Sequence, residues 1–160
     1  MPRDALTQDI SIRVAQPSDK DQLARLCEAL WPESKADEHL AHVSPILDRP
    51  SLLKMPAMFL VAEAAGGKLI GFLEVGLRSH ADGCDDAQAV GYIEGWYVVE
   101  AHRRQCVGAR LLAAAEDWAR GKGCMEMASD ALIENQVSQR AHEALGYSVV
   151  DRCVHYRKAL

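Results

Sequence analysis

The first third of the chain predicts one strand followed by two helices. Residues 10–15 alternate between apolar and polar side chains, which is typical of a half-buried strand. The next apolar residues recur with the spacing of one helix face: Leu23, Leu26, Cys27 and Leu30. Ser18 or Asp19 would cap this helix, and the Trp-Pro pair that begins at Trp31 would end it. A second helix is expected over residues 37–47, before the next Arg-Pro pair.

The middle of the chain predicts three strands. The apolar runs 58–64 and 68–78 are joined across Gly66-Gly67, a pair typical of a hairpin turn. A polar loop over 79–88 leads into a third strand over 89–99. Regular side-chain alternation would place three residues of that strand on one face: Glu94, Trp96 and Val98.

The last third predicts helix, strand, helix and strand. One helix begins near Gly108 and ends at a Gly-Lys-Gly sequence, and a short strand is expected over 126–129. A further helix over 136–145 would lead into a final strand from Tyr147 to about Lys158. The order βααβββαβαβ predicts an α/β fold with a mixed, mostly antiparallel central sheet flanked by helices, in a single domain over residues 1–160.

Composition and charge narrow the class of protein. The 160 residues are 49% hydrophobic and contain no apolar run of bilayer length, and the N-terminus lacks the apolar core of a signal peptide. We therefore expect a cytoplasmic protein that does not bind a membrane. The five cysteines form no Cys-x-x-Cys pair, so neither a disulfide framework nor a zinc site is predicted. The net charge of −5 argues against nucleic acid and favours a cationic ligand.

The junction between the strand that ends near residue 99 and the next helix is the clearest chemical signal. Free backbone N–H groups and the positive end of the helix dipole would converge there and bind a diphosphate without a metal. The residues expected to form this diphosphate loop are Arg103, Arg104, Gln105, Cys106, Val107, Gly108 and Ala109. The alternative is an ordinary strand-to-helix junction with solvated arginines.

The loop resembles the acetyl-CoA pyrophosphate loop of the GCN5-related N-acetyltransferases (GNAT), whose pattern is Arg-x-x-Gly-x-Gly or Ala. In this frame Cys106 stands at the first glycine, where its Cβ limits close approach and left-handed backbone angles. A shifted frame pairs Gln105 with Gly108 but puts Arg110 where a small residue belongs. The first frame is therefore preferred.

A wider set of residues resembles the aminoglycoside 6'-N-acetyltransferases within that superfamily. The matching segments are Leu30-Trp31-Pro32, Ala128-Ser129-Asp130, Glu134-Asn135, Ser138, His142, Ala144-Leu145-Gly146-Tyr147 and Tyr156-Arg157-Lys158. The resemblance implies acetyl-CoA as co-substrate, no metal, and transfer to the 6'-amine of an aminoglycoside or other cationic polyamine by direct attack in a ternary complex. It also implies antibiotic resistance and a homodimer.

The resemblance assigns residues to the cofactor. The backbone N–H of Val98 would donate to the thioester carbonyl. Asn135 would lie near the pantetheine or the pyrophosphate, or would cap the helix that follows it. His142 stands where the superfamily usually has the tyrosine that protonates the thiolate, so it is either that acid or a helix-surface histidine hydrogen-bonded to a neighbour. Ser138 would orient His142 or bind the cofactor itself.

Glu94 and Asp130 are the candidates for binding the acceptor ammonium and for accepting its proton, without deciding which is the base. The alternatives are a solvent-facing strand residue for Glu94 and a turn or cap residue for Asp130. Trp31 would form an aromatic wall for a sugar ring, whereas Trp118 belongs to the core. Several acidic residues are secondary contacts at most: Glu33, Asp37, Glu38, Asp82, Asp85 and Asp86. The pair His39 and His42 is expected on the helix surface.

Three other functions are compatible with parts of the sequence. An acetyltransferase for a polyamine or basic peptide would share the cofactor site and an acidic cleft. A non-catalytic acyl-CoA-binding module would explain Cys106 and the missing tyrosine. A nucleotide-binding α/β protein unrelated to acyl transfer ranks last, because the chain has neither a Gly-x-Gly-x-x-Gly strand-turn-helix nor a Walker lysine.

Overall fold

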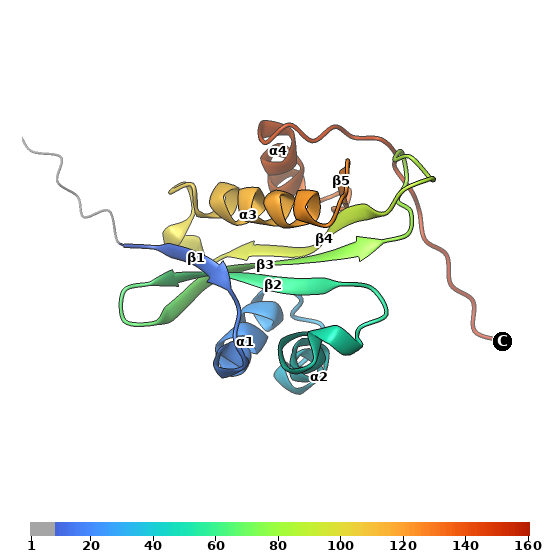
Figure 1. Ribbon diagram of the computed structural model, residues 1–160. Coiled ribbons are helices and arrows are strands. Elements are labelled where there is room, and N and C mark those ends of the chain that lie inside the picture. The colour runs from blue at the N-terminus through green and yellow to red at the C-terminus, as the bar shows by residue number, and fades with distance from the viewer. Residues whose placement is uncertain (1–8) are drawn as a thin grey trace, which may run out of the picture.

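The computed structural model describes residues 9–160 and contains a five-stranded sheet between layers of helices (Figure 1). The strands lie side by side in chain order: β1 (Ser11–Val14), β2 (Ala57–Ala64), β3 (Lys68–Arg78), β4 (Val90–Val98) and β5 (Met127–Ser129). Neighbouring strands are antiparallel except β4 and β5, which are parallel. The predicted mixed, mostly antiparallel sheet with flanking helices is confirmed.

The helices divide between the two faces of this sheet. α1 (Lys20–Leu30) and α2 (Ala36–Asp48) cover one face, and α3 (Val107–Gly121) covers the other (Figure 1). α4 (Gln136–Ala144) lies on the α3 side, near β5. The four helices that the apolar spacing predicted are confirmed to within about two residues. No helix within residues 9–160 is long and apolar enough to cross a lipid bilayer.

Two hydrophobic clusters hold these layers together. The cluster under α3 joins Leu111 and Ala115 to Leu73 of β3, and Trp118 packs at its edge, as predicted. The cluster under α1 and α2 joins Leu23 and Val43 to two buried rings: Phe59 and Phe72. Because apolar groups cover both faces of the sheet, β3 is buried along most of its length.

The hairpin between β2 and β3 has the predicted turn. Gly66 and Gly67 have φ angles of 83° and 81°, which are accessible to glycine without a Cβ clash. The N–H of Gly67 donates to the carbonyl of Ala64 at 3.2 Å. The Gly-Gly signal therefore specified this connection correctly.

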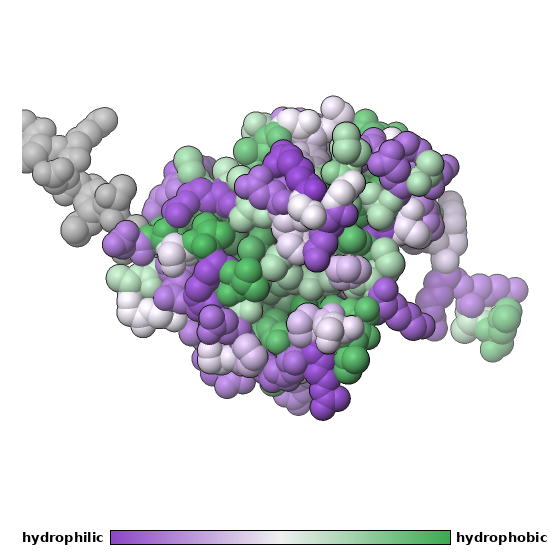
Figure 2. All heavy atoms as spheres, in the orientation of Figure 1, coloured by the Kyte–Doolittle hydropathy of each residue, from purple (hydrophilic) through white to green (hydrophobic). Residues whose placement is uncertain are grey.

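The predicted final strand from Tyr147 to Lys158 is wrong. Residues 147–160 form no strand, and the C-terminal part projects from the body with apolar side chains open to solvent (Figures 1 and 2). The exposed apolar residues of this segment include Val149, Val150, Val154 and Tyr156. A strand requires a neighbour for its N–H and C=O groups, and within residues 9–160 the segment has none.

The predicted common face for Glu94, Trp96 and Val98 is also wrong. Glu74 pairs with Gly95, whereas Val75 pairs with Ile93, so Glu94 is an extra residue in β4 and forms a β-bulge. Trp96 and Val98 pack on the α3 side of the sheet, while Glu94 points toward α2. The bulge thus separates the carboxylate from the core face of its own strand.

The acidic residue before α1 has a different role from the predicted cap. The Asp19 side chain makes no capping hydrogen bond to α1. Its oxygens accept from the Gln16 N–H at 2.7 Å and from the Arg13 guanidinium at 2.7 and 2.9 Å. Arg13 also donates to Glu63 of β2 at 2.8 Å. The Arg13 bonds hold the pKa of Asp19 below its ordinary value and connect β1 to the start of α1.

We predict that Asp19→Asn lowers the free energy of unfolding at pH 7 by about 2 kcal/mol, because charge-assisted bonds to a buried carboxylate are lost. The carboxylate stabilises the fold fully above its unfolded pKa of about 3.9, and this stabilisation is lost as the pH falls through the lowered folded pKa. Urea denaturation at pH 7 and at about pH 3 should therefore show a difference that shrinks in acid. The control is Asp21→Asn on the exposed side of α1. An equal loss for both variants at pH 7 would contradict this role.

Candidate active site

The segment between the end of β4 and the start of α3 contains several backbone N–H groups without acceptors. The chain leaves β4 through a short 3-10 turn, Glu100–His102, and then places Arg104 and Cys106 at φ angles of 59° and 60°. The N–H of Arg110 donates to the Cys106 carbonyl at 3.0 Å. Within the described part of the chain, the backbone N–H groups of residues 104–109 have no hydrogen-bond acceptor. Left-handed residues among such N–H groups form the concave anion site typical of phosphate loops.

The Cβ atom of Cys106 strains this loop, whereas the absence of a Cβ at Gly108 allows close packing. Cys106 precedes α3 in a left-handed conformation that costs a residue with a Cβ about 1 kcal/mol or more. Gly108 lies against the indole of Trp96, where an added Cβ would be 3.2 Å from the ring. The glycine therefore allows α3 to approach β4 closely.

The polar side chains in and beside the loop mostly donate to backbone carbonyls of the protein. Arg103 Nε donates to the Val98 carbonyl at 2.8 Å, and the Gln105 amide donates to the Ala101 carbonyl at 3.2 Å. Arg110, outside the predicted set, donates to the Ile10 carbonyl at 2.9 Å. Arg104 is exposed beside the free N–H groups. In this structure, an anion in the loop would meet backbone donors first and Arg104 next.

The edge of β4 next to this loop is open. β5 pairs only with residues 91–93, so beyond Ile93 the described chain provides no strand neighbour on that side. The Val99 N–H donates to the Ile70 carbonyl at 2.9 Å. Because successive peptide groups of a strand point to opposite sides, the N–H of Val98 points to the open edge. A ligand along this edge would run directly into the loop.

His142 of α4 lies beside this region between two aromatic rings. Its ring centroid is 5.3 Å from that of Trp96 and 5.7 Å from that of Tyr147. Nδ1 lies 2.7 Å from the Ser138 carbonyl, which can only accept, so Nδ1 carries a proton. Nε2 lies 2.8 Å from the Ser129 hydroxyl and accepts from it when the ring is neutral. His142 is thus hydrogen-bonded to Ser138 and Ser129, which both the acid and the hydrogen-bonded alternative allow.

Two residues near His142, Asn135 and Tyr147, also have specific hydrogen-bond partners. The side chain of Asn135 accepts from the N–H of Ser138 at 3.1 Å, so Asn135 caps α4. The hydroxyl of Tyr147 donates to Glu116 at 3.0 Å, and burial raises the pKa of this phenol well above its ordinary value. The side chain of Tyr147 packs on the core under α3.

Glu94 and Asp130 are joined through two residues that the sequence analysis missed. Arg78 donates to both carboxylate oxygens of Glu94, at 2.9 and 2.7 Å. Its guanidinium lies 3.5 Å above the ring centroid of Tyr92, whose hydroxyl donates to Asp130 at 2.9 Å. Burial and the bond to Asp130 raise the pKa of Tyr92 to about 12. Arg78 and Tyr92 meet only because β3 and β4 pair, a register that the sequence did not reveal.

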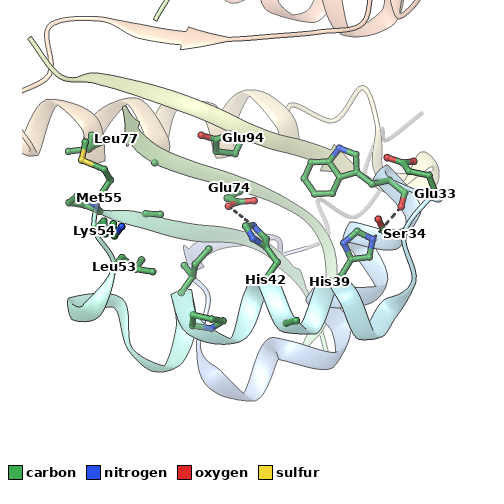
Figure 3. Close-up of a pocket in the computed structure, with 17 residues that line it drawn as sticks. Glu33, Ser34, His39, His42, Leu53, Lys54, Met55, Glu74, Leu77 and Glu94 are labelled. Atoms are coloured by element: carbon green, nitrogen blue, oxygen red, sulfur yellow. Dashed lines mark hydrogen bonds and ion pairs between the residues drawn. The ribbon is translucent and has the colours of Figure 1, made fainter. Parts of the chain in front are cut away.

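A cavity of about 700 Å³ lies between the sheet and α2 (Figure 3). Glu74 and Glu94 project into it from β3 and β4, and His42 reaches Glu74 from α2 with Nε2 2.8 Å from Oε1. Trp31 lines one end of the cavity, stacked on the ring of His39 with centroids 6.1 Å apart. An added Cβ at Gly95 would lie 2.4 Å from the Trp31 ring, so the absence of a side chain at this glycine makes room for the indole.

The histidines of α2 correct a further prediction. The expected surface position is wrong for His39, which is buried, whereas His42 is exposed as predicted and forms an ion pair with a carboxylate that is 3% exposed, Glu74. The bond to Glu74 raises the pKa of His42. The signal that the sequence analysis missed was a lone acidic residue in the middle of the apolar run 68–78.

Two cavities hold part of the predicted site, whereas Val98, residues 103–109, Asn135 and Ser138 line neither of them. Trp31, Glu33 and Glu94 line the first, whereas Asp82, Asp130 and His142 line a second of about 980 Å³ bounded by β5, α4 and the C-terminal segment. The remaining acidic candidates line neither: Asp37, Glu38, Asp85 and Asp86. Among residues 9–160, no three His, Cys, Asp or Glu side chains are arranged to hold a metal ion. The site therefore combines an anion-binding loop, an open strand edge and carboxylates in a cavity.

Comparison with known proteins identifies the family. A model of the acetyltransferase (GNAT) family matches residues 21–147. The aminoglycoside N(6')-acetyltransferase type 1 of Klebsiella aerogenes is 41% identical over 138 residues, which cover 86% of this chain and 88% of that protein.

Solved structures agree with the sequence comparison. AAC(6')-Iy in complex with CoA has a TM-score of 0.86 at 33% identity, covering 98% of this chain and 99% of that chain. AAC(6')-Iy in complex with the bisubstrate analogue CoA-S-monomethyl-acetylneamine has a TM-score of 0.83 at 34% identity, covering 94% of this chain and 99% of that chain. This chain therefore belongs to the GNAT family of acetyltransferases and, within it, to the aminoglycoside N(6')-acetyltransferases of type 1.

Proposed function

We propose that this protein transfers acetyl from acetyl-CoA to the 6'-amine of aminoglycoside antibiotics by direct attack within a ternary complex. The observation that carries the proposal is the continuity between the open edge of β4 and the free N–H groups of residues 104–109. Family membership supports it, because the relatives named above are aminoglycoside N(6')-acetyltransferases. Acetylation replaces an ammonium with a neutral amide, which weakens binding of the drug to RNA phosphates and so confers resistance.

The cofactor residues follow from the donors of the site. We assign the N–H of Val98 to the thioester carbonyl, where it would stabilise the developing oxyanion. The diphosphate would accept from the N–H groups of residues 104–109, which include Gln105, Cys106, Val107, Gly108 and Ala109, with charge supplied by Arg104. Arg103 would contribute by holding the end of β4 through its bond to the Val98 carbonyl.

Three side chains near α4 remain candidates for cofactor contacts. The amide nitrogen of Asn135 stays available for acetyl-CoA while its oxygen caps α4. Ser138 positions His142 through its carbonyl. As an imidazolium, His142 would supply a proton for the departing thiolate through Nε2 and the Ser129 hydroxyl.

The acceptor would bind beside the carboxylates that line the two cavities. Trp31 offers an apolar ring face for a sugar, and Glu94 and Asp130 offer negative charge for the ammonium. Either carboxylate would accept the proton that the amine must lose. Arg78 holds Glu94 in place through two hydrogen bonds, so an arriving ammonium would share this carboxylate with the guanidinium.

Organisation and location are part of the same proposal. We propose one acetyltransferase domain over residues 1–160, a homodimer and a cytoplasmic enzyme. The exposed apolar residues of the C-terminal segment support pairing with a second copy. The five cysteines lie without disulfide bonds, which agrees with a reducing compartment.

A coenzyme A release assay with a panel of amines tests the reaction. Kanamycin should be acetylated with a higher kcat/KM than spermidine or a lysine peptide. Preference for spermidine or the peptide would redirect the proposal to another amine. Tight acetyl-CoA binding with no turnover on any amine would favour a non-catalytic module.

We predict that Glu94→Gln and Asp130→Asn each raise KM for kanamycin about tenfold, because each removes a charge-assisted contact to an ammonium. KM for acetyl-CoA should stay unchanged in steady-state kinetics. Asp117→Asn, which removes a carboxylate on the exposed side of α3, is the control. Unchanged kinetics in both test variants would remove these carboxylates from the site.

We predict that Cys106→Gly tightens acetyl-CoA binding severalfold, because glycine adopts a φ of 60° without Cβ strain and lets a phosphate approach more closely. Calorimetric titration with acetyl-CoA measures the effect, and Cys153→Gly in the C-terminal segment controls for loss of a thiol. Weaker binding in Cys106→Gly would show that the loop contacts the phosphates elsewhere.

We predict that removal of residues 148–160 converts a dimer into a monomer, because it deletes exposed apolar side chains that a second copy would cover. Light scattering after size-exclusion chromatography gives the mass of the full chain and of the shortened chain. A full-length monomer, or a dimer that survives the deletion, would contradict this dimer interface.

A further inference from the structure

The pair of Glu74 and His42 has no role in the reaction described above. Glu74 is 3% exposed and projects from β3 into the cavity that also holds Trp31 and Glu94 (Figure 3). Its Oε1 contacts His42 Nε2 at 2.8 Å, and its other oxygen forms no hydrogen bond within residues 9–160. A carboxylate so far from bulk water requires a cation, and here that cation is a histidine.

The histidine is less firmly held than its partner. The side chain of His42 is 53% exposed, against 5% for that of Glu74, and its other ring nitrogen bonds to no group in the described chain. The edge of its ring rests on Phe59, with centroids 6.1 Å apart. A rotation about its side-chain bonds would release Glu74 without disturbing the core.

The charges around the pair favour a cation from outside. His42 faces Glu74 of β3 and Glu94 of β4 across the cavity, and Glu33 and Lys54 line the same cavity from loops. His39 lies one turn earlier on α2, and on α1 the thiol of Cys27 is close enough for Glu74 to help raise its pKa, after burial itself. Arg78 is already paired with Glu94. The carboxylates of the cavity are thus balanced in part by a histidine that can leave.

We propose that Glu74 is a second cation subsite, which binds an ammonium of the aminoglycoside other than the one acetylated, and that His42 occupies this subsite until the ammonium displaces it. The inference rests on the proposed function and deepens it. It makes Glu74 a specificity-determining residue that selects acceptors with several amines over acceptors with one.

Displacement of His42 by an ammonium would change the protonation of this histidine. The bond to Glu74 raises the pKa of His42 above its ordinary value, so the imidazolium form persists to higher pH in the free protein. When an ammonium replaces the ring at Glu74, the pKa of His42 falls back toward about 6.5. Binding near neutral pH therefore releases a proton from His42 to the buffer.

Kinetics with two acceptors test the subsite. Kanamycin carries several amines, whereas methyl 6-amino-6-deoxyglucoside carries one amine that corresponds to the reacting group. Glu74→Gln should raise KM for kanamycin about tenfold or more, and leave KM for the glucoside and for acetyl-CoA unchanged. Glu28→Gln, which removes an exposed carboxylate from α1, is the matched control.

The outcomes separate the two proposals. An equal effect of Glu74→Gln on both acceptors, or no effect on either, overturns the subsite. If the wild-type protein acetylates neither acceptor, the proposed function itself fails.

Calorimetry provides a second test that does not depend on the folding of Glu74→Gln. Kanamycin is titrated into the wild-type protein and into His42→Gln near pH 7, each in two buffers of different ionisation enthalpy. The wild-type protein should release more protons per bound drug than His42→Gln, whose amide can bind Glu74 but does not titrate. Equal proton release by the two proteins overturns the displacement of His42.

Discussion

The site depends on β4 losing its neighbour partway along its length. Up to Ile93 the strand is paired on both sides, and beyond Ile93 its outer edge faces no strand of the described chain. Peptide groups left unpaired in a protein interior are unfavourable unless water or a ligand satisfies them. The same strand then leads into a loop whose N–H groups are also free. One continuous row of main-chain donors is thus available to an extended ligand with an anionic end.

The β-bulge at Glu94 gives the two faces of this strand different chemistry. On one face Trp96 packs against Gly108 and His142, next to the open edge. On the other face the bulge turns Glu94 toward α2, and the missing side chain of Gly95 leaves room for Trp31. A regular strand would have put the carboxylate into the hydrophobic core under α3. The extra residue therefore allows a charged acceptor cavity to lie directly beside an apolar core.

Local signals in the sequence predicted most of the fold. The Gly66-Gly67 turn and the apolar helix faces depend on residues close together in the chain, so composition and spacing were sufficient. The prediction of a final strand from Tyr147 to Lys158 was wrong because a strand needs a partner strand, and the sequence does not show which segment would pair with it. The prediction that Glu94 shares a face with Trp96 and Val98 was wrong for a related reason, since a bulge follows from the pairing of two strands.

The candidate site was predicted unevenly for the same physical reason. The loop over residues 103–109 could be predicted because its N–H groups are consecutive in the chain. The links from Arg78 to Glu94 and from His42 to Glu74 join residues far apart in sequence, and each depends on the sheet register or on the packing of α2. The spacing of histidines on α2 predicted only that they face the surface, and it did not reveal that the His42 ring binds Glu74 of β3.

Amide hydrogen exchange measured with and without acetyl-CoA tests the central claim most directly. The account predicts slower exchange at the N–H groups of Val98 and residues 104–109 when acetyl-CoA is bound, with little change in the amides of α1. Acetyl-CoA binding that leaves exchange at these positions unaltered would contradict the claim that main-chain donors of β4 and the adjoining loop hold the cofactor.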